Sequence, residues 1–225
     1  IYGYIDGQSG YYWGTGVILS EDGLILTNTH VVSGCDSATV QLSDNTEYEA
    51  KLVGADELSD IAVLKIEASG LKAARFGESR DLAVGDKVAA IGNPLGETFR
   101  LTLTDGIISA IERGISYKGH SMTLLQTNTA INEGNSGGAL FNLYGEVIGI
   151  TNAKYSSSGS SSEASIDNIG FAIPIDQVRS IFESIITNGY IVKPYIGVTV
   201  SDVSSESQSY GLPQGAAVRP GTENG

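Results

Sequence analysis

One serine lies in a segment rich enough in glycine to hold its hydroxyl exposed for reaction. Ser136 is the centre of the segment Gly134-Asn135-Ser136-Gly137-Gly138. Glycines allow the backbone to turn tightly on both sides of the serine. The N–H groups of Gly134 and Ser136 could then converge on one point and stabilise a negatively charged oxygen. An ordinary glycine-rich turn would have the same sequence, so the pentapeptide alone leaves both interpretations open.

A serine nucleophile needs a base, and the chain has two histidines. His30 follows an apolar run at residues 24–26, where we expect the end of a strand. A satisfied core histidine would fit the same position. His120 lies in a polar stretch at 117–121, where an exposed histidine without a function is the simpler interpretation. His30 is therefore the better candidate for the base.

The imidazole of such a base needs a carboxylate to orient it. Asp60 directly precedes the apolar run 61–66, which is a natural place for a buried, hydrogen-bonded acid at the start of a strand. A solvated acid that ends the preceding turn would also fit. Asp56 and Glu57 are competitors, but both lie within that turn.

The order of these residues along the chain separates two classes of serine hydrolase. The α/β-hydrolases share the glycine-flanked serine but place the acid and then the histidine after it. Here no histidine follows Ser136. The order His30, Asp60, Ser136 is that of chymotrypsin. It predicts acyl transfer to Ser136, followed by hydrolysis.

Longer segments resemble the HtrA/Deg family of serine proteases. The likeness runs through residues 14–18, 22–32, 60–66, 92–96, 106–109, 126–140, 170–175 and 195–198. The resemblance implies His30 as general base, Asp60 as its orienting acid and Ser136 as nucleophile. Thr29 stands where many members carry Asn. Residues 1–13, with several tyrosines, match no segment of the family, although an N-terminal loop used for trimer contacts is usual there.

The resemblance also implies binding elements around these three residues. An oxyanion hole is shaped by Gly134, Asn135 and Ser136. The substrate lies as an added strand beside Asn152-Ala153-Lys154, and Ile131 and Lys154 line the pocket for the residue before the cut. The segment Tyr195-Ile196-Gly197-Val198 is similar to the carboxylate-binding loop that opens a PDZ domain.

Substrates, partners and location follow from the same resemblance. It implies a protein-quality-control endopeptidase that cleaves unfolded or flexible polypeptides, works as a homotrimer and needs no cofactor. It implies a location outside the cytoplasm, in the cell envelope or secreted, with a membrane tether beyond the chain given. Because Asn135 cannot form the ion pair of chymotrypsin-type zymogens, Ile1 is not expected to be an activation-generated terminus. We expect activity to depend instead on ordering of the loops at 113–121, 131–135 and 153–168.

The elements that must position these groups are mostly strands. Frequent glycine, 29 of 225 residues, with short apolar runs indicates many tight turns. We predict an all-β, chymotrypsin-like double six-stranded β-barrel with a C-terminal helix and an incomplete PDZ segment. A protease domain spans 1–190, with barrel one at about 10–77, barrel two at about 84–175 and a helix at 176–188 capped by Asp176. Residues 191–225 form a linker and partial PDZ domain.

Composition excludes several other functions. A formal net charge of -13 argues against nucleic acid as a partner. One cysteine, Cys35, permits no intrachain disulfide, and one Cys with two His makes a structural zinc site improbable. No apolar run of 18 residues exists. Two alternatives stay open: a catalytically silent peptide-binding or chaperone homologue, and a structural β-barrel in which His30 and Ser136 lie far apart.

Overall fold

The computed structural model describes residues 1–7, 9–94, 97–117, 120–153, 168–191, 198–203, 210 and 215–220. The chain divides into two compact units, Ile1–Ile191 and Val192–Gly225. Within the described ranges no helix has the length and apolar character needed to cross a membrane.

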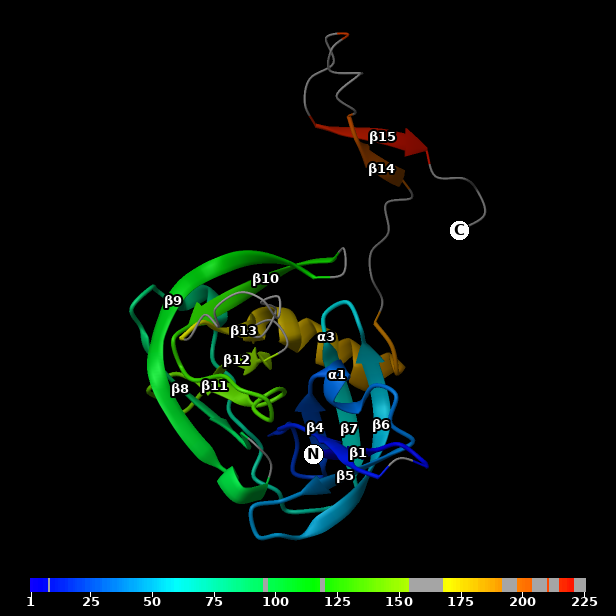
Figure 1. Ribbon diagram of the computed structural model, residues 1–225, viewed down its shortest axis with the longest axis vertical. Coiled ribbons are helices and arrows are strands. Elements are labelled where there is room, and N and C mark those ends of the chain that lie inside the picture. Colours follow the sequence, from blue (N-terminus) through cyan, green and yellow to red (C-terminus); the bar gives the residue numbers. More distant parts are fainter. Residues whose placement is uncertain are drawn as a thin grey trace. The chain divides into compact units, whose positions relative to one another are not determined.

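The N-terminal half of the first unit is one antiparallel sheet of seven strands (Figure 1). The strands are β1 (Tyr2–Tyr4), β2 (Tyr11–Trp13), β3 (Val17–Ile18), β4 (Leu24–Thr27), β5 (Ser37–Gln41), β6 (Glu47–Asp56) and β7 (Ile61–Ile66). Their order is β2-β1-β5-β6-β7-β4-β3. A hairpin thus joins β3 to β4. Strand β7 lies antiparallel beside β4, so the end of β4 at Thr27 lies next to the start of β7 at Ala62.

The C-terminal half of this unit is a closed barrel of order β10-β13-β12-β11-β8-β9. Its strands are β8 (Lys87–Gly92), β9 (Thr102–Tyr117), β10 (His120–Thr127), β11 (Ala139–Phe141), β12 (Val147–Thr151) and β13 (Gly170–Pro174). The long β9 curves around one side of the barrel and pairs with β8 and then β10 (Figure 1). Closure leaves this sheet without a free edge.

Burial explains why these segments become strands. Val88 and Ala90 alternate with more exposed residues in β8, as expected for a strand with one face in the core. Val147 to Thr151 are all buried, because β12 is covered on both faces. One large core cluster combines residues of both sheets and the C-terminal helix, among them Leu26, Val63, Leu124, Ile150 and Val178. The two halves of the first unit therefore share a core.

The helices are few in the described part of the chain. They are α1 (Thr29–Val32), α3 (Ile175–Asn188) and the 3₁₀ turns η1 (Ser79–Asp81) and η2 (Glu97–Phe99). Helix α3 buries Val178 and Ile185 on one face and ends at Gly189, whose φ of 77° is the left-handed conformation typical of a helix stop. The prediction that Asp176 caps α3 is wrong. The N-cap is Pro174, and the carboxylate of Asp176 accepts the N–H of Arg80 at 2.8 Å instead.

The second unit contains one described sheet, in which β14 (Val198–Asp202) pairs antiparallel with β15 (Ala216–Pro220). Tyr210 is exposed.

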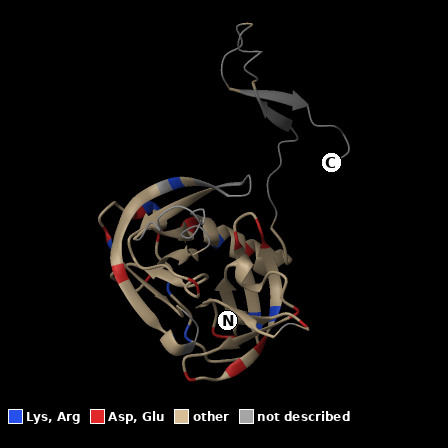
Figure 2. Cartoon of the chain, in the orientation of Figure 1, with Lys and Arg blue, Asp and Glu red and all other residues tan. Residues whose placement is uncertain are grey.

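The predicted all-β, chymotrypsin-like architecture is confirmed. The N-terminal half differs in detail, because it has seven strands in an open order rather than six in a barrel. The additional strands come from residues 1–13: β1 pairs with both β2 and β5. Acidic and basic residues are scattered over both halves (Figure 2).

Candidate active site

Asp60 and His30 are joined where β7 begins and β4 ends. The Nδ1 atom of His30, on the short helix α1, lies 2.6 Å from Oδ2 of Asp60. The backbone N–H of His30 donates to Oδ1 of the same carboxylate at 2.9 Å. An ionised carboxylate only accepts, so against one a neutral His30 ring carries its proton on Nδ1 and keeps a lone pair on Nε2. That tautomer is the one that a general base needs.

The backbone around Asp60 is fixed by the segment before His30. Asp60 has a φ of 55°, uncommon for a residue other than glycine, and is 1% exposed. Its carbonyl accepts the side-chain amide of Asn28 at 2.9 Å and the N–H of Thr29 at 3.2 Å. The hydroxyl of Thr29 donates to the carbonyl of Ile61 at 2.9 Å. Asn28 and Thr29 thus position the backbone of residues 60 and 61, in addition to the bonds that reach the Asp60 side chain.

A third donor to the acid comes from the barrel. The side-chain amide of Asn152 is fully buried and donates to Oδ2 of Asp60 at 2.7 Å. Three hydrogen bonds therefore reach this carboxylate from two residues. Together they fix the orientation of the carboxylate toward the ring of His30.

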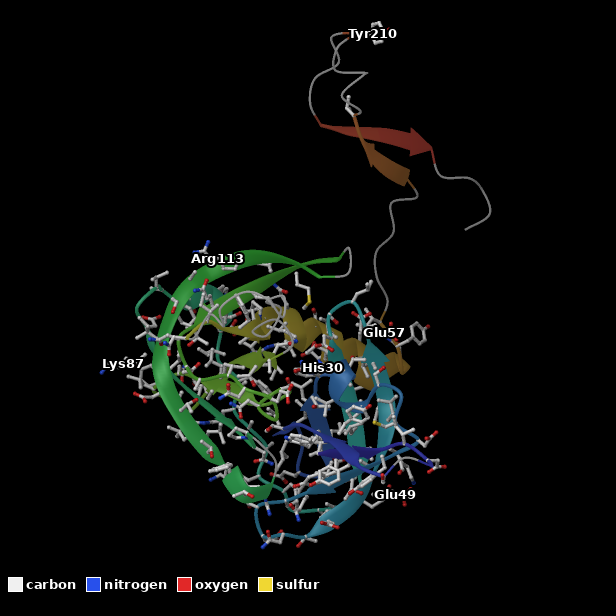
Figure 3. The ribbon with its side chains drawn as sticks, in the orientation of Figure 1. His30, Glu49, Glu57, Lys87, Arg113 and Tyr210 are labelled. Carbon is white, nitrogen blue, oxygen red and sulfur yellow. The ribbon has the colours of Figure 1, made fainter. Side chains whose placement is uncertain are left out.

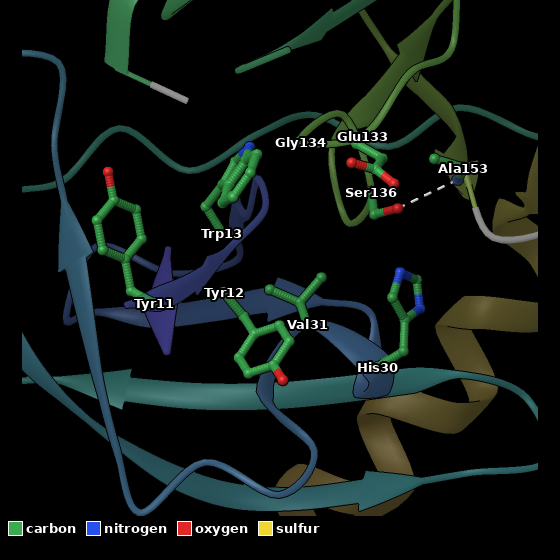
Figure 4. Close-up of a pocket in the computed structure, with 9 residues that line it drawn as sticks. All are labelled: Tyr11, Tyr12, Trp13, His30, Val31, Glu133, Gly134, Ser136 and Ala153. Carbon is green, nitrogen blue, oxygen red and sulfur yellow. Dashed lines mark hydrogen bonds between the residues drawn. The ribbon is translucent and has the colours of Figure 1, made fainter. Parts of the chain in front are cut away.

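Ser136 lies on the barrel side of the same site. Its Oγ accepts the N–H of Ala153 at 3.1 Å (Figure 4). No hydrogen bond joins Ser136 to His30 in the described part of the structure, although both line one pocket. Figure 3 shows His30 between the sheet that carries Glu49 and Glu57 and the barrel that carries Lys87 and Arg113. A rotation about the Cα–Cβ bond of Ser136 would turn its hydroxyl away from Ala153.

The turn before Ser136 depends on glycine at residue 134. Gly134 has a φ of 94°, and a Cβ there would lie 2.0 Å from the carbonyl oxygen of Asn93. Among the described residues, the N–H groups of Gly134 and Ser136 have no acceptor. The N–H of Asn135, in contrast, donates to the carbonyl of Asn132 at 3.0 Å. Of the three predicted oxyanion-hole residues, two therefore have N–H groups available for an oxyanion.

Thr15 connects the first sheet to this turn. Its hydroxyl donates to the carbonyl of Gly134 at 2.7 Å and accepts the N–H of Asn93 at 3.1 Å. Its own N–H donates to the carbonyl of Ser136 at 2.8 Å. The hydroxyl of Thr27 in turn donates to the carbonyl of Thr15 at 2.8 Å. The nucleophile's turn is thus bonded to strands that carry the base.

A pocket of about 430 Å³ opens beside these groups. It is lined by Tyr11, Tyr12, Trp13, His30, Val31, Glu133, Gly134, Ser136 and Ala153 (Figure 4). Residues of β2 and Glu133 were not among the sequence-predicted site residues. Three consecutive aromatic residues directly before the matching segment at 14–18 were the signal that could have indicated them.

The other predicted site residues are spread more widely. Ile131 is 7% exposed and packs in the barrel core with Leu125 and Leu140. The side-chain amide of Asn152 donates to Asp60, and its backbone N–H donates to the carbonyl of Phe171 at 2.9 Å. The predictions for Lys154, Tyr195, Ile196 and Gly197 fall outside the described residues. Val198 begins β14, and its side chain also falls outside the description.

Two further predictions concern His120 and a structural zinc site. The backbone of His120 pairs with Tyr117 at the start of β10. The prediction that its side chain is exposed falls outside the described residues. Within the described ranges, no group of three His, Cys, Asp or Glu residues could hold a metal ion.

Burial, with a smaller contribution from the charge of Asp36, raises the pKa of the half-buried Cys35 thiol and so disfavours its reactive thiolate.

Comparison with known proteins places this arrangement in a family. Residues 14–150 match the trypsin-like peptidase domain. A solved structure of the HtrA-type protease AlgW with a tripeptide is 39% identical, has a TM-score of 0.81, and is matched over 100% of this chain and 72% of that one. The chain belongs to the HtrA-type serine proteases. A second AlgW structure, with a decapeptide, is 40% identical with a TM-score of 0.80, covering 94% of this chain and 64% of that one.

Curated HtrA-type relatives are longer than this chain. The serine protease Do-like HtrA of Bacillus subtilis is 43% identical over 205 residues, which are 88% of this chain and 44% of that protein. A probable periplasmic serine endoprotease, DegP-like, of Halomonas elongata is 45% identical over 208 residues, 91% of this chain and 42% of that protein. The chain thus spans less than half the length of these HtrA-type proteases.

Proposed function

We propose that this HtrA-type chain is a serine endopeptidase with His30, Asp60 and Ser136 as its catalytic triad. The proposal rests on one observation: a histidine oriented by a carboxylate and a serine line the same pocket. The ring of His30 is bonded to the buried carboxylate of Asp60 at 2.6 Å, and Ser136 lines the same pocket. This arrangement also argues against a purely structural barrel.

The proposed reaction has two steps. The Oγ of Ser136 attacks the peptide carbonyl while Nε2 of His30 takes the hydroxyl proton. The same proton passes to the leaving amine as the C–N bond breaks, which leaves an acyl group on Ser136. Water then attacks the acyl carbonyl, and its proton returns through His30 to Ser136 as the acid product leaves. Asp60 stays ionised throughout and stabilises the imidazolium ring.

The N–H groups of Gly134 and Ser136 are proposed to bind the oxygen that becomes negative in each step. Both groups are free of acceptors among the described residues, and Gly134 has the backbone conformation that only glycine adopts easily there. Asn135 supports this turn from within: its side-chain amide donates to the carbonyl of Ala130 at 3.1 Å. It contributes shape rather than a donor.

The proposed substrates are unfolded or flexible polypeptides. A chain bound as an added strand beside residues 152–154 must be extended, which a folded protein seldom offers. Ile131 and Lys154 are proposed to border the pocket for the residue before the cut. The two AlgW structures are named for a bound tripeptide and decapeptide, which supports peptides as ligands of this family's fold.

The wider assignments rest on relatives. We propose a protease domain at 1–190 and a linker with part of a PDZ domain at 191–225, supported by the separate compact unit at Val192–Gly225. Within it, residues 195–198 are proposed as the carboxylate-binding loop. A role in protein quality control, a homotrimeric state and a location outside the cytoplasm, with a membrane tether, are proposed by analogy; several relatives are named periplasmic.

Labelling with a fluorophosphonate tests the proposed function. We expect one label per chain on Ser136, and none in Ser136→Ala. Ser43→Ala, which changes an exposed serine in another turn, is the matched control and should label fully. Cleavage of denatured casein should follow the labelling. A chain that binds peptides but is neither labelled nor active would be the catalytically silent homologue.

A further inference from the structure

The aromatic side chains of β2 form a wall of the catalytic pocket that the reaction itself does not require. Tyr11 and Tyr12 are 45% and 53% exposed, large values for aromatic residues beside the buried Asp60 and the partly buried His30. Tyr11 is held in place by ring contacts with the buried Tyr2, at 5.2 Å between centroids, and with Trp13, at 6.1 Å. The rings of Tyr11 and Trp13 are thus packed together before any ligand arrives, which lowers the cost of binding one.

Glu133 gives this aromatic wall a charge. It is exposed and lines the pocket next to Gly134. Among the described residues that line the pocket, no Lys or Arg accompanies it. Aromatic faces attract cations, and a nearby carboxylate adds to that attraction. The aliphatic stem of Lys or Arg can also pack along the rings while its charged end stays near water. The chemistry of the pocket therefore favours a long cationic side chain.

The position of the pocket indicates which part of a substrate would enter it. Ala153 and the β2 rings lie on opposite sides of Ser136 (Figure 4). Ala153 belongs to the segment 152–154, beside which the acyl part of the substrate is proposed to lie. Val31, next to the base that protonates the leaving amine, lies on the β2 side of the site with Tyr12. The rings and Glu133 therefore border the residues that follow the cut.

We propose that β2 and Glu133 form a subsite that selects Lys or Arg at the first or second position after the scissile bond. This inference rests on the proposed peptidase function and adds a specificity to it. Selection arises because the cation gains both the ring faces and the carboxylate, whereas an uncharged chain of equal length gains only the ring contacts. An acidic side chain would be repelled by Glu133.

Quenched fluorescent peptides test the subsite. The peptides share one acyl part, taken from a site cut in denatured casein, and carry Lys, norleucine or Glu at one of the two positions after the cut. We expect kcat/KM to be roughly fivefold higher for Lys than for norleucine, and lowest for Glu. In Glu133→Gln the ratio of Lys to norleucine should fall to about 2, because the ring faces alone still attract the cation. The matched variant Glu49→Gln, on the exposed face of β6, should keep the ratio of the unchanged protein.

Tyr12→Leu keeps the carboxylate and removes one ring, so it should lower the same ratio by a smaller factor. Equal kcat/KM for the Lys and norleucine peptides in the unchanged protein would overturn the subsite. The same holds if the Lys-to-norleucine ratio in Glu133→Gln equals that of the unchanged protein. Fluorophosphonate labelling of the same samples separates the two proposals. A labelled protein without preference contradicts only the subsite, whereas an unlabelled one contradicts the peptidase function.

Discussion

The two sides of the active site are held in place to different degrees. On the first sheet, Asp60 is 1% exposed and its carboxylate has three hydrogen bonds, two of which join it to the ring and the backbone of His30. On the barrel side, the hydroxyl of Ser136 is bonded to Ala153 rather than to His30. The proposed acid and base are thus already joined, whereas the proposed nucleophile is bonded to another group. Changes on the two sides should therefore affect different steps.

The largest effect should come from Asp60→Asn. An amide cannot stabilise the imidazolium ring and would favour the wrong tautomer of His30, so kcat/KM should fall by about 10⁴. Peptide hydrolysis at several pH values measures the fall in kcat/KM, and circular dichroism checks that the fold persists. A loss of less than tenfold would mean that the preorganised acid is not the orienting group.

Gly134→Ala tests the nucleophile side. The new Cβ would meet the carbonyl of Asn93, so the turn must shift and one oxyanion donor moves away. We expect kcat to fall by about 10²–10³ with little change in KM. Gly145→Ala is the matched control. Gly145 also has a positive φ, of 72°, but a Cβ there would approach only the Arg75 side chain, at 4.0 Å, so the change should cost stability and leave kcat unchanged.

Asn152→Ala tests the link between the two sides. It removes one of three hydrogen bonds to Asp60, and a bond to a charged group is worth about 1.5–3 kcal/mol. We expect kcat to fall by at least about tenfold, with KM unchanged, because Asn152 positions the acid without touching the scissile bond.

Asn152→Asp sharpens this result. It would place a second carboxylate against Asp60 and should therefore lower kcat more than Ala does, most strongly at high pH, where both acids are ionised. Equal activity of the two variants would show that Asn152 only fills space.

The smallest effect is expected for Glu78→Gln, outside both sides. Glu78 forms surface ion pairs with Arg80 at 3.0 Å and Arg179 at 3.9 Å. Exposed pairs contribute about 0–1 kcal/mol, so the free energy of unfolding should change by less than about 1 kcal/mol and kcat not at all. Urea unfolding and peptide hydrolysis measure both. A clear loss of kcat would mean that the site is coupled to this surface.

Sequence reasoning located the strands with strong apolar patterns. The strands predicted at 24–27 and 61–66 coincide with β4 and β7, because their side chains bury together. It failed where pairing alone makes a strand. The sequence predicts separate strands at 101–103 and 106–111, yet Thr104 and Asp105 between them pair with β8, and β9 runs through both. The strands β1 and β2 have only three residues each, too few for a pattern.

The candidate site shows the same limit. His30 and Asp60 are 30 residues apart, yet residue types and order sufficed to pair them, and they lie 2.6 Å apart. Asn152 is 92 residues from Asp60 in sequence, and nothing in its neighbourhood indicates that its amide reaches the acid. The side-chain rotation of Ser136 likewise depends on Ala153, which packing places beside it. Contacts such as these, which no residue pattern marks, are found only in the three-dimensional structure.

The three bonds of Thr15 make the two halves of the protease fold dependent on each other. A single side chain and its amide tie the start of β3 to Gly134, Ser136 and Asn93. Neither half by itself can assemble the catalytic turn. A chain severed between β7 and β8 should therefore yield two inert fragments, and any hydrolysis regained on mixing them would report directly on their reassociation.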